Sequence, residues 1–165
     1  MRKIQFKGYD EKLKKWVFGY YVKRFLTTPC MFNSKIEKDK WHEENTKHLI
    51  AYDGFSDWGM PRDLVANIVV EESIGQYTGL KDMNGKEIYE GDLLRYPAKS
   101  DWEKENYTLF EVFYHDNIGC FQMSRTHYKG SLCGGMIAGF KAENTEKMIN
   151  VGNVFDFNFD GFRGK

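Results

Sequence analysis

Four side chains in the second half of the chain are of the types that bind zinc. They are His115, Cys120, His127 and Cys133. Structural zinc sites usually contain a closely spaced pair of cysteines or of histidines. This set contains no such pair, and a buried cysteine also packs well as a small apolar residue. The sequence therefore predicts no metal site, and we expect no cofactor.

Nucleophiles and acid–base pairs are equally poorly supported. Ser73, Ser124 and Ser131 lack the G-x-S-x-G context of an activated serine. The neighbouring carboxylates Glu71 and Glu72 would face opposite ways in a strand and would not share one environment. We therefore assign no catalytic residue and expect a protein that is not an enzyme, with an unrecognised activity as the remaining alternative.

The most distinctive chemistry is a group of basic residues placed among aromatic rings near the N-terminus. Such a combination is typical of single-stranded nucleic-acid platforms, where bases stack on the rings. Tyrosine, tryptophan and arginine also dominate the binding energy of protein interfaces. The candidate interaction surface consists of Lys12, Lys14, Lys15, Trp16, Tyr20, Tyr21 and Arg24.

The same residues have a simpler explanation, which the pattern favours. Trp16, Phe18 and Tyr20 alternate along the chain, so they would lie on one face of a strand. That face would be the core face, and the lysines would form a solvated turn. In this interpretation the rings stabilise the fold and bind nothing.

The elements that would position this surface are short strands. Polar and apolar residues alternate over residues 3–9, and residues 16–22 are rich in aromatic and β-branched side chains. The two segments predict a β-hairpin with a charged turn between them. Residues 33–60 are rich in Lys and Glu and in turn formers, and predict a loop-rich or mobile segment or a short exposed helix. Residues 63–70 fit a short helix or a strand, and their valines favour a strand.

Turn signals become frequent after residue 75. Asn84-Gly85 predicts a tight hairpin with a type I′ turn, in which both central residues need positive φ. A strand at residues 93–96 is stopped by Pro97, and further strands are predicted at residues 107–115 and 147–155. Several short strands at close spacing predict a small barrel over residues 75–157.

Composition limits the function classes. The 165 residues carry 24 basic and 24 acidic side chains, and the zero net charge argues against a dedicated nucleic-acid binder. Residues 1–70 have a net charge of +4 and residues 71–165 of −4, which fits two subdomains, a polar self-association surface, or ordinary surface variation. Three cysteines, no secretory signal and no long apolar run predict a cytoplasmic protein that does not enter a membrane.

The stretch Gln76–Leu93 closely resembles the signature of the YopX family, small proteins of bacteriophages and prophages of Gram-positive bacteria. Ile4–Asp10 looks like the opening strand of that family, and Val151–Asp156 is similar to its closing strand. Residues 25–65 lie outside the resemblance, and the end of the chain lacks the expected proline-containing sequence. The signature residues are Tyr77, Gly79, Asp82, Asn84, Gly85, Gly91 and Asp92.

The resemblance implies a mainly β (α+β) protein in three parts. These are an N-terminal α+β region with a hairpin (1–74), an SH3-like β-barrel (75–157) and a tail (158–165). It implies no enzymatic activity, and its turn-rich signature is predicted to be structural. We expect a phage or prophage accessory protein in the cytoplasm of an infected or lysogenic host. It would bind a host or phage protein and could form a homo-oligomer, with nucleic acid as the less favoured partner.

Overall fold

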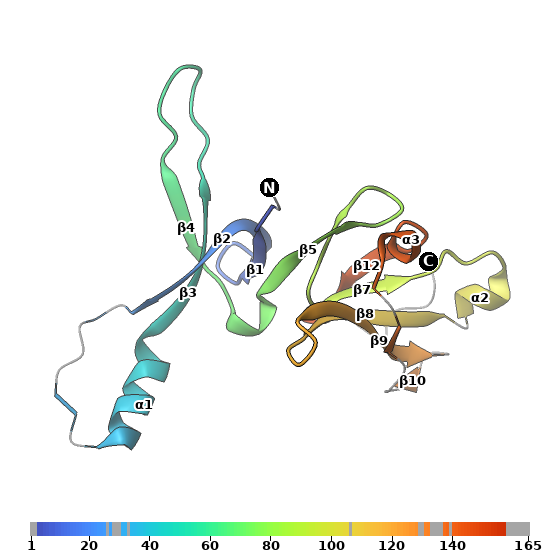
Figure 1. Ribbon diagram of the computed structural model, residues 1–165. Coiled ribbons are helices and arrows are strands. Elements are labelled where there is room, and N and C mark those ends of the chain that lie inside the picture. The colour runs from blue at the N-terminus through green and yellow to red at the C-terminus, as the bar shows by residue number, and fades with distance from the viewer. Residues whose placement is uncertain are drawn as a thin grey trace. The chain divides into compact units, whose positions relative to one another are not determined.

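The computed structural model describes residues 3–25, 27, 31–32, 34–105, 107–128, 131–132, 137–138 and 140–157. The predicted tail and the side chains of Cys30 and Cys133 lie outside these residues. The chain divides into two compact units, an N-terminal unit over Ile4–Ile74 and a C-terminal unit that starts at Gly75 and includes Lys3. Both are mainly β, with antiparallel pairing throughout the described strands (Figure 1).

The N-terminal unit contains four antiparallel strands in the order β4-β3-β2-β1. The predicted hairpin is confirmed, because Tyr9 pairs with Trp16 and Phe6 with Gly19. Residues 54–63 connect β3 to β4 and project from the unit (Figure 1). The elements are β1 (Phe6–Asp10), β2 (Lys15–Phe25), α1 (Lys35–Asn45), β3 (Thr46–Asp53), β4 (Leu64–Ile68) and the 3-10 turn η1 (Glu71–Ser73).

One prediction for this unit was partly wrong, and one open alternative is decided. The prediction for residues 33–60 was right about a short exposed helix, which Ser34 caps by accepting a hydrogen bond from the Glu37 backbone N–H. It was wrong about Thr46–Asp53, which forms the central strand β3. For residues 63–70 both a helix and a strand were considered, with the valines favouring a strand, and Leu64–Ile68 is a strand.

The core of this unit lies on one face of the sheet. Val17, Ile50 and Val69 are buried there, and Phe6, Tyr21, Tyr52 and Ile74 pack against them. The chain curls tightly around this core, since the Val70 N–H donates to the Tyr9 carbonyl. A Cβ on Gly8 would come within 2.8 Å of Val69, so glycine at that position permits the close approach.

The hairpin turn is fixed by the buried carboxylate of Asp10. Its Oδ1 accepts from the backbone N–H groups of Lys12 and Leu13, and its Oδ2 accepts from Asn67 Nδ2 at 2.6 Å. The hydrogen bond from Leu13 is the largest influence on the pKa of Asp10, and together with the bonds from Asn67 and Lys12 it lowers that pKa although burial opposes the shift.

The lowered pKa of Asp10 predicts how the protein responds to acid. A carboxylate with a lowered folded-state pKa stabilises the fold above its unfolded pKa of about 3.9, and this contribution is lost as pH falls through the folded value. We expect Asp10→Asn to reduce the free energy of unfolding at pH 7 and to weaken its decline towards pH 3. Urea unfolding across this pH range measures both effects, and parallel curves for the two proteins would contradict the role of Asp10.

The C-terminal unit contains a hairpin, β5 and β6, and a larger sheet with the order β10-β9-β8-β7-β12, in which β11 also pairs with β9. The strands do not close into a barrel among the described residues, so the predicted SH3-like barrel is not confirmed. The elements are β5 (Gly75–Lys81), β6 (Glu87–Tyr89), β7 (Asp92–Arg95), α2 (Asp101–Glu105), β8 (Thr108–His115), β9 (Cys120–Tyr128), β10 (Ser131–Leu132), β11 (Ile137–Ala138), α3 (Ala142–Thr145) and β12 (Ile149–Asn153).

A second core lies within this unit. Its buried members come from strands that are far apart in the sequence, with Met148 directly before β12, and Phe110 and Phe140 pack against them. The predicted strand before Pro97 is β7, and its four residues are buried. The buried residues of this core are Ile88, Leu94, Val112, Met123 and Met148.

Candidate functional site

The predicted basic and aromatic residues do not form one surface. Lys12 and Lys14 lie in the turn between β1 and β2, where Lys14 has a positive φ of 50°, and Lys15 begins β2 opposite Asp10. All three lysines are exposed. They therefore sit at the end of the hairpin, and the aromatic residues follow along the strand.

The rings of the predicted set have different surroundings. Trp16 is half-buried, with Tyr9 at 5.6 Å between ring centroids and the Lys7 ammonium 4.5 Å above its ring. Tyr21 lies on the core face of β2. Tyr20 is 65% exposed on the opposite face. Only part of the predicted aromatic surface is therefore available to a ligand.

The favoured interpretation of the strand, with Trp16, Phe18 and Tyr20 as its core face, is wrong. Phe18 is 46% exposed, and Tyr20 more so, while the buried face of β2 carries Val17 and Tyr21. Alternation in the sequence identified two faces correctly but assigned them the wrong way round.

The exposed side of the N-terminal sheet is a largely apolar surface, which we call the outer face. Its rows follow from strand register, because residues paired in antiparallel strands share a face. Tyr20 pairs with Ala51, which pairs with Ala66, and Val22 pairs with Leu49, which pairs with Ile68. The exposed large residues of the outer face are Phe18, Tyr20, Val22, Leu64 and Ile68.

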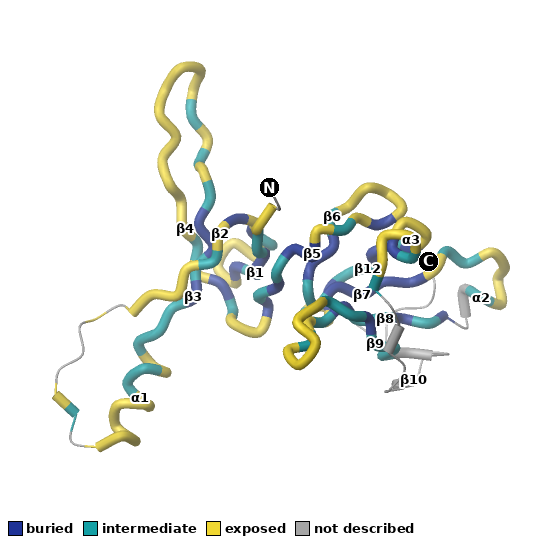
Figure 2. Tube along the Cα trace, viewed as in Figure 1, coloured by how far each residue is buried: buried dark blue, intermediate teal, exposed yellow. Residues whose placement is uncertain are grey.

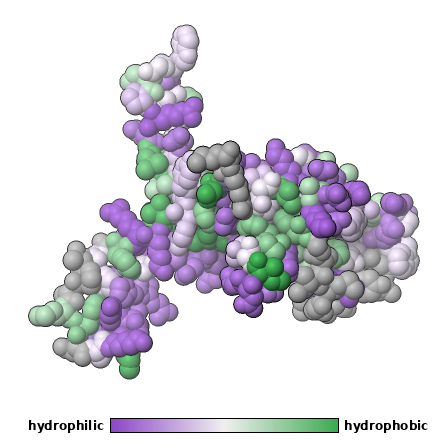
Figure 3. Space-filling model, in the orientation of Figure 1, coloured by the Kyte–Doolittle hydropathy of each residue, from purple (hydrophilic) through white to green (hydrophobic). Residues whose placement is uncertain are grey.

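The outer face could not be read from the sequence because β2 and β4 are joined only through β3. In Figure 3 hydrophobic and hydrophilic residues are interspersed over the visible side of this unit. An exposed apolar patch rimmed by polar side chains is characteristic of an interaction site. Phe18, Val22, Leu64 and Ile68 are the members that our sequence-based set missed.

Two like charges lie at one end of the outer face. Arg24 of β2 is paired directly with Lys47 of β3. Within the described part of the chain, no carboxylate forms an ion pair with either side chain. Like charges directly opposite each other across strands are destabilising. An anionic group of a ligand would relieve this repulsion.

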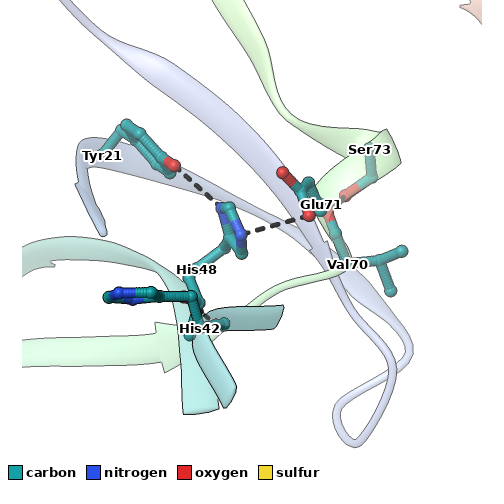
Figure 4. Close-up of polar contacts among 7 residues, drawn as sticks. Tyr21, His42, His48, Val70, Glu71 and Ser73 are labelled. Carbon is teal, nitrogen blue, oxygen red and sulfur yellow. Dashed lines mark hydrogen bonds and ion pairs between the residues drawn. The ribbon is translucent and has the colours of Figure 1, made fainter. Parts of the chain in front are cut away.

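A hydrogen-bonded chain of three titratable residues lies on the core side of the same sheet (Figure 4). Tyr21 Oη is 2.8 Å from His48 Nδ1, and His48 Nε2 is 3.2 Å from Glu71 Oε2. In the neutral ring, Nε2–H donates to the carboxylate and Nδ1 accepts from the tyrosine hydroxyl. Burial, followed by the charge of Glu71, raises the pKa of Tyr21. The hydroxyl therefore keeps its proton at neutral pH, which suits a structural bond better than a nucleophile.

In the C-terminal unit, the signature residue Asp82 organises the turn between β5 and β6. Its Oδ1 accepts from the backbone N–H groups of Asn84 and Lys86, and its Oδ2 accepts from the Asn150 N–H at 3.0 Å. Gly85 has a φ of 78°, but Asn84 does not have positive φ. The predicted type I′ turn is therefore wrong, since that turn needs positive φ at both residues.

The signature residue Asp92 links the middle of the chain to its closing strand. Its Oδ2 accepts from the Tyr89 N–H at 2.9 Å and from Asn150 Nδ2 at 2.7 Å, and its Oδ1 accepts from Asn153 Nδ2 at 3.3 Å. The carboxylate is buried. Gly79 and Gly91 have φ values of 90° and 77°, as expected for glycines at special backbone angles.

A family model described as "YopX protein" matches residues 5–156, which is nearly the whole chain. The chain belongs to the YopX family. The match extends over both units and includes the Asp82 and Asp92 networks. No curated protein matches the chain.

The chain is also similar to a solved structure, that of protein EF1440 from Enterococcus faecalis. The two chains are 21% identical, and the alignment covers 93% of this chain and 94% of the other, with a TM-score of 0.48. No helix among the described residues is long and apolar enough to cross a membrane.

Tyr77, another residue of the YopX signature, lies in a cluster of rings and charges. Its ring centroid is 5.4 Å from that of Tyr89 and lies beneath the Lys3 ammonium. Glu87 accepts from Lys3 Nζ at 2.6 Å and from Tyr89 Oη at 2.7 Å. Burial works to raise the pKa of Glu87, but the bonds from Lys3 and Tyr89 outweigh it and lower that pKa. The signature side chains are thus engaged with other parts of this unit, which supports a structural role.

The potential metal ligands of the described residues are scattered in this YopX-family chain, and a cavity lies in its C-terminal unit. No group of three or more potential ligands that could hold a metal occurs among the described residues, and the His127 side chain lies outside them. A cavity of about 720 Å³ in the C-terminal unit is lined by Tyr96, Tyr107 and Lys147, among others. Burial raises the pKa of Tyr107, so its hydroxyl stays protonated and is not a base at neutral pH.

Proposed function

We propose that this chain is a phage or prophage accessory protein that acts in the host cytoplasm as a non-catalytic protein-interaction module. The outer face of the N-terminal sheet is its docking site. The partner is a protein whose contact surface is apolar and carries carboxylates at its edge. The single observation that carries this proposal is the exposure of Phe18, Tyr20 and Val22 on one face of β2.

The chemistry of the outer face supports a protein partner. Its central rows are aromatic or aliphatic, and burying such side chains against another apolar surface is the main source of binding energy. Arg24 and Lys47, at one end of the outer face, would both donate hydrogen bonds to a carboxylate placed between them. An apolar centre with a polar or charged rim is the usual arrangement of a protein interface, and the outer face has both.

A nucleic-acid ligand is the second candidate, because exposed Lys14, Lys15 and Arg24 lie on the same strand or turn as exposed Tyr20. Single-strand platforms stack successive bases on several rings. In this chain Trp16 is half-buried and Tyr21 contacts His48, so fewer rings are accessible than that function needs. These placements favour the protein partner.

Tyr20→Glu is expected to weaken partner binding at least tenfold, because it puts a charge in the centre of an apolar contact (about 1.4 kcal/mol or more). The bait is the tagged chain in infected or lysogenic host cells, with nuclease added before elution. The affinity is then measured with the purified partner. Trp58→Glu is the matched control, since Trp58 is fully exposed in the β3–β4 loop and off the outer face. Equal affinities for Tyr20→Glu and Trp58→Glu would exclude the outer face.

Salt and nuclease distinguish the two candidates. Binding through phosphates should fall by orders of magnitude between about 50 and 200 mM salt, whereas an apolar protein interface should change little. A single-stranded oligonucleotide is the probe, and Lys14→Glu with Lys15→Glu should abolish its binding only if nucleic acid is the ligand. If nuclease removes the captured material and the double lysine variant no longer binds the oligonucleotide, nucleic acid is the ligand and the protein partner is rejected.

A further inference from the structure

Strand β4 is an open edge of the N-terminal sheet. Among the described residues it pairs with β3 and with no other strand. Leu64, Val65, Ala66 and Ile68 are all exposed (Figure 2). An edge strand presents unpaired backbone groups that can extend the sheet into another chain.

The hydrogen bonds at the two ends of the β3–β4 ladder show which backbone groups point outward. The Gly54 N–H donates to the Asp63 carbonyl, and the Val69 N–H donates to the His48 carbonyl. In an antiparallel pair, hydrogen-bonded residues alternate with residues whose groups face away. The odd-numbered residues of β4 therefore bond to β3, and Leu64, Ala66 and Ile68 direct their N–H and C=O groups away from the sheet.

This edge lacks the usual protection against pairing. Natural edge strands carry charges, prolines or bulges that prevent contact with another strand. Leu64–Ile68 contains no charged residue and no proline, and its pairing with β3 is regular from Leu64 to Ile68. The three outward residues also place their side chains on the outer face, so the edge is apolar as well as unpaired.

We propose that β4 pairs with β4 of a second copy of this chain, antiparallel and around a two-fold axis at Ala66. Ala66 then lies opposite the second copy's Ala66, and Leu64 lies opposite the second copy's Ile68. All the outward N–H and C=O groups of the strand gain partners in this register. The small Ala66 at the axis lets the two backbones approach without steric conflict.

Charges next to the strand fit this register. Backbone pairing ends at Ile68, because the Val70 N–H is already bonded to the Tyr9 carbonyl of its own chain. In this register Arg62 of each copy lies near the end of the other copy's strand, which Glu71 and Glu72 follow. The arrangement occurs twice because the contact is symmetric, and no like charges face each other within the paired segment. A second copy is therefore electrostatically compatible with this edge, whereas a charged peptide would have no matching residue in Leu64–Ile68.

The surface beside part of β4 is hollowed next to the hairpin turn. A groove of about 460 Å³ lies between Ala66–Val70 and the turn residues Asp10–Leu13. The N-terminal end of the second copy's β4 would enter this groove, which would bring the second copy's Arg62 close to Glu11. The dimer would join strands β1–β4 of the two copies into one continuous sheet. This proposal does not depend on the proposed function, because it concerns the edge of the sheet and not a foreign partner.

The test is the concentration-dependent mass of the full chain by sedimentation equilibrium. We expect a closed dimer, and Ala66→Pro should raise its dissociation constant at least about tenfold by removing the central donor from each copy. Proline is tolerated at this position of an edge strand because the Ala66 N–H does not serve the β3–β4 ladder. Ala66→Ser keeps the N–H and the small size, so it is the matched control and should dimerise like the wild type.

Two further measurements keep the test decisive. Ile68→Lys places a charge on the edge without changing the backbone, and it should weaken the dimer even if Ala66→Pro does not fold. In the dimer the amides of Leu64, Ala66 and Ile68 should exchange with solvent slowly, and dilution should speed them up. A monomer at all concentrations up to about 1 mM, an open-ended assembly, or a dimer that both substitutions leave intact would overturn the proposal.

Discussion

Asp92→Ala is expected to lower the free energy of unfolding by about 3–5 kcal/mol. The substitution leaves three donors without their acceptor, namely the Tyr89 N–H and the side-chain amides of Asn150 and Asn153. Asn150 and Asn153 belong to β12, which pairs with β7. The substitution therefore removes hydrogen bonds between the signature segment and the closing strand. Urea unfolding of the purified chain measures the lost stability.

The matched control for this prediction is Asp116→Ala. Asp116 is an exposed aspartate in the turn between β8 and β9, and its removal should change stability by less than about 0.5 kcal/mol. Asp92→Asn keeps the shape of the side chain but replaces one acceptor oxygen by a donor, so its cost should lie between those of the two alanine variants. If Asp92→Ala and Asp116→Ala cost the same, the buried network contributes nothing to stability.

The signature shows how far local sequence can predict backbone conformation. Gly79 and Gly91 were expected at unusual backbone angles, and both have positive φ. The turn type at Asn84-Gly85 was wrong because Asp82, two residues earlier, accepts backbone hydrogen bonds that define a longer loop. The dipeptide alone carries no information about that carboxylate. The second carboxylate oxygen of Asp82 accepts from the backbone N–H of Asn150, which is 68 residues away in the sequence.

The faces of β2 show a different limit. A period of two separates Val17 and Tyr21 from Phe18 and Tyr20, but it cannot tell which pair is buried. That choice is made by Val69 and Ile74, which pack against the Val17 side from about 50 residues further along the chain. The more aromatic face was the natural choice for the core, and it is the exposed one. The same alternation that misled the fold prediction is what now identifies the outer face.

Strand β3 was not predicted because only its second half, Leu49–Tyr52, is apolar, and polar residues precede it. Its first residues are Thr46, Lys47 and His48, and the preceding helix is rich in Lys and Glu. Pairing with β2 on one side and β4 on the other extends the strand through these polar residues. The candidate site depends on β3, since it carries Ala51 and Leu49 between the exposed residues of its two neighbours.

Ile50→Ala is expected to lower the free energy of unfolding by about 2–5 kcal/mol, because it removes a fully buried side chain and leaves a cavity. Ile50 lies at the centre of β3, and among the described residues the other buried members of its core cluster are Val17 and Val69. A core of this size has few neighbours that could move to fill the space, so we expect a value in the upper half of the range.

The matched control is Ile36→Ala, because Ile36 is 81% exposed on α1 and the same atoms are removed there without a cavity. Its effect should be within about 0.5 kcal/mol. Amide exchange locates the loss, since Ile50→Ala should speed exchange in β2 and β3 before it reaches β8 and β9 in the other unit. Equal acceleration in all four strands would mean that the two units unfold as one, and the N-terminal core would then have no stability of its own.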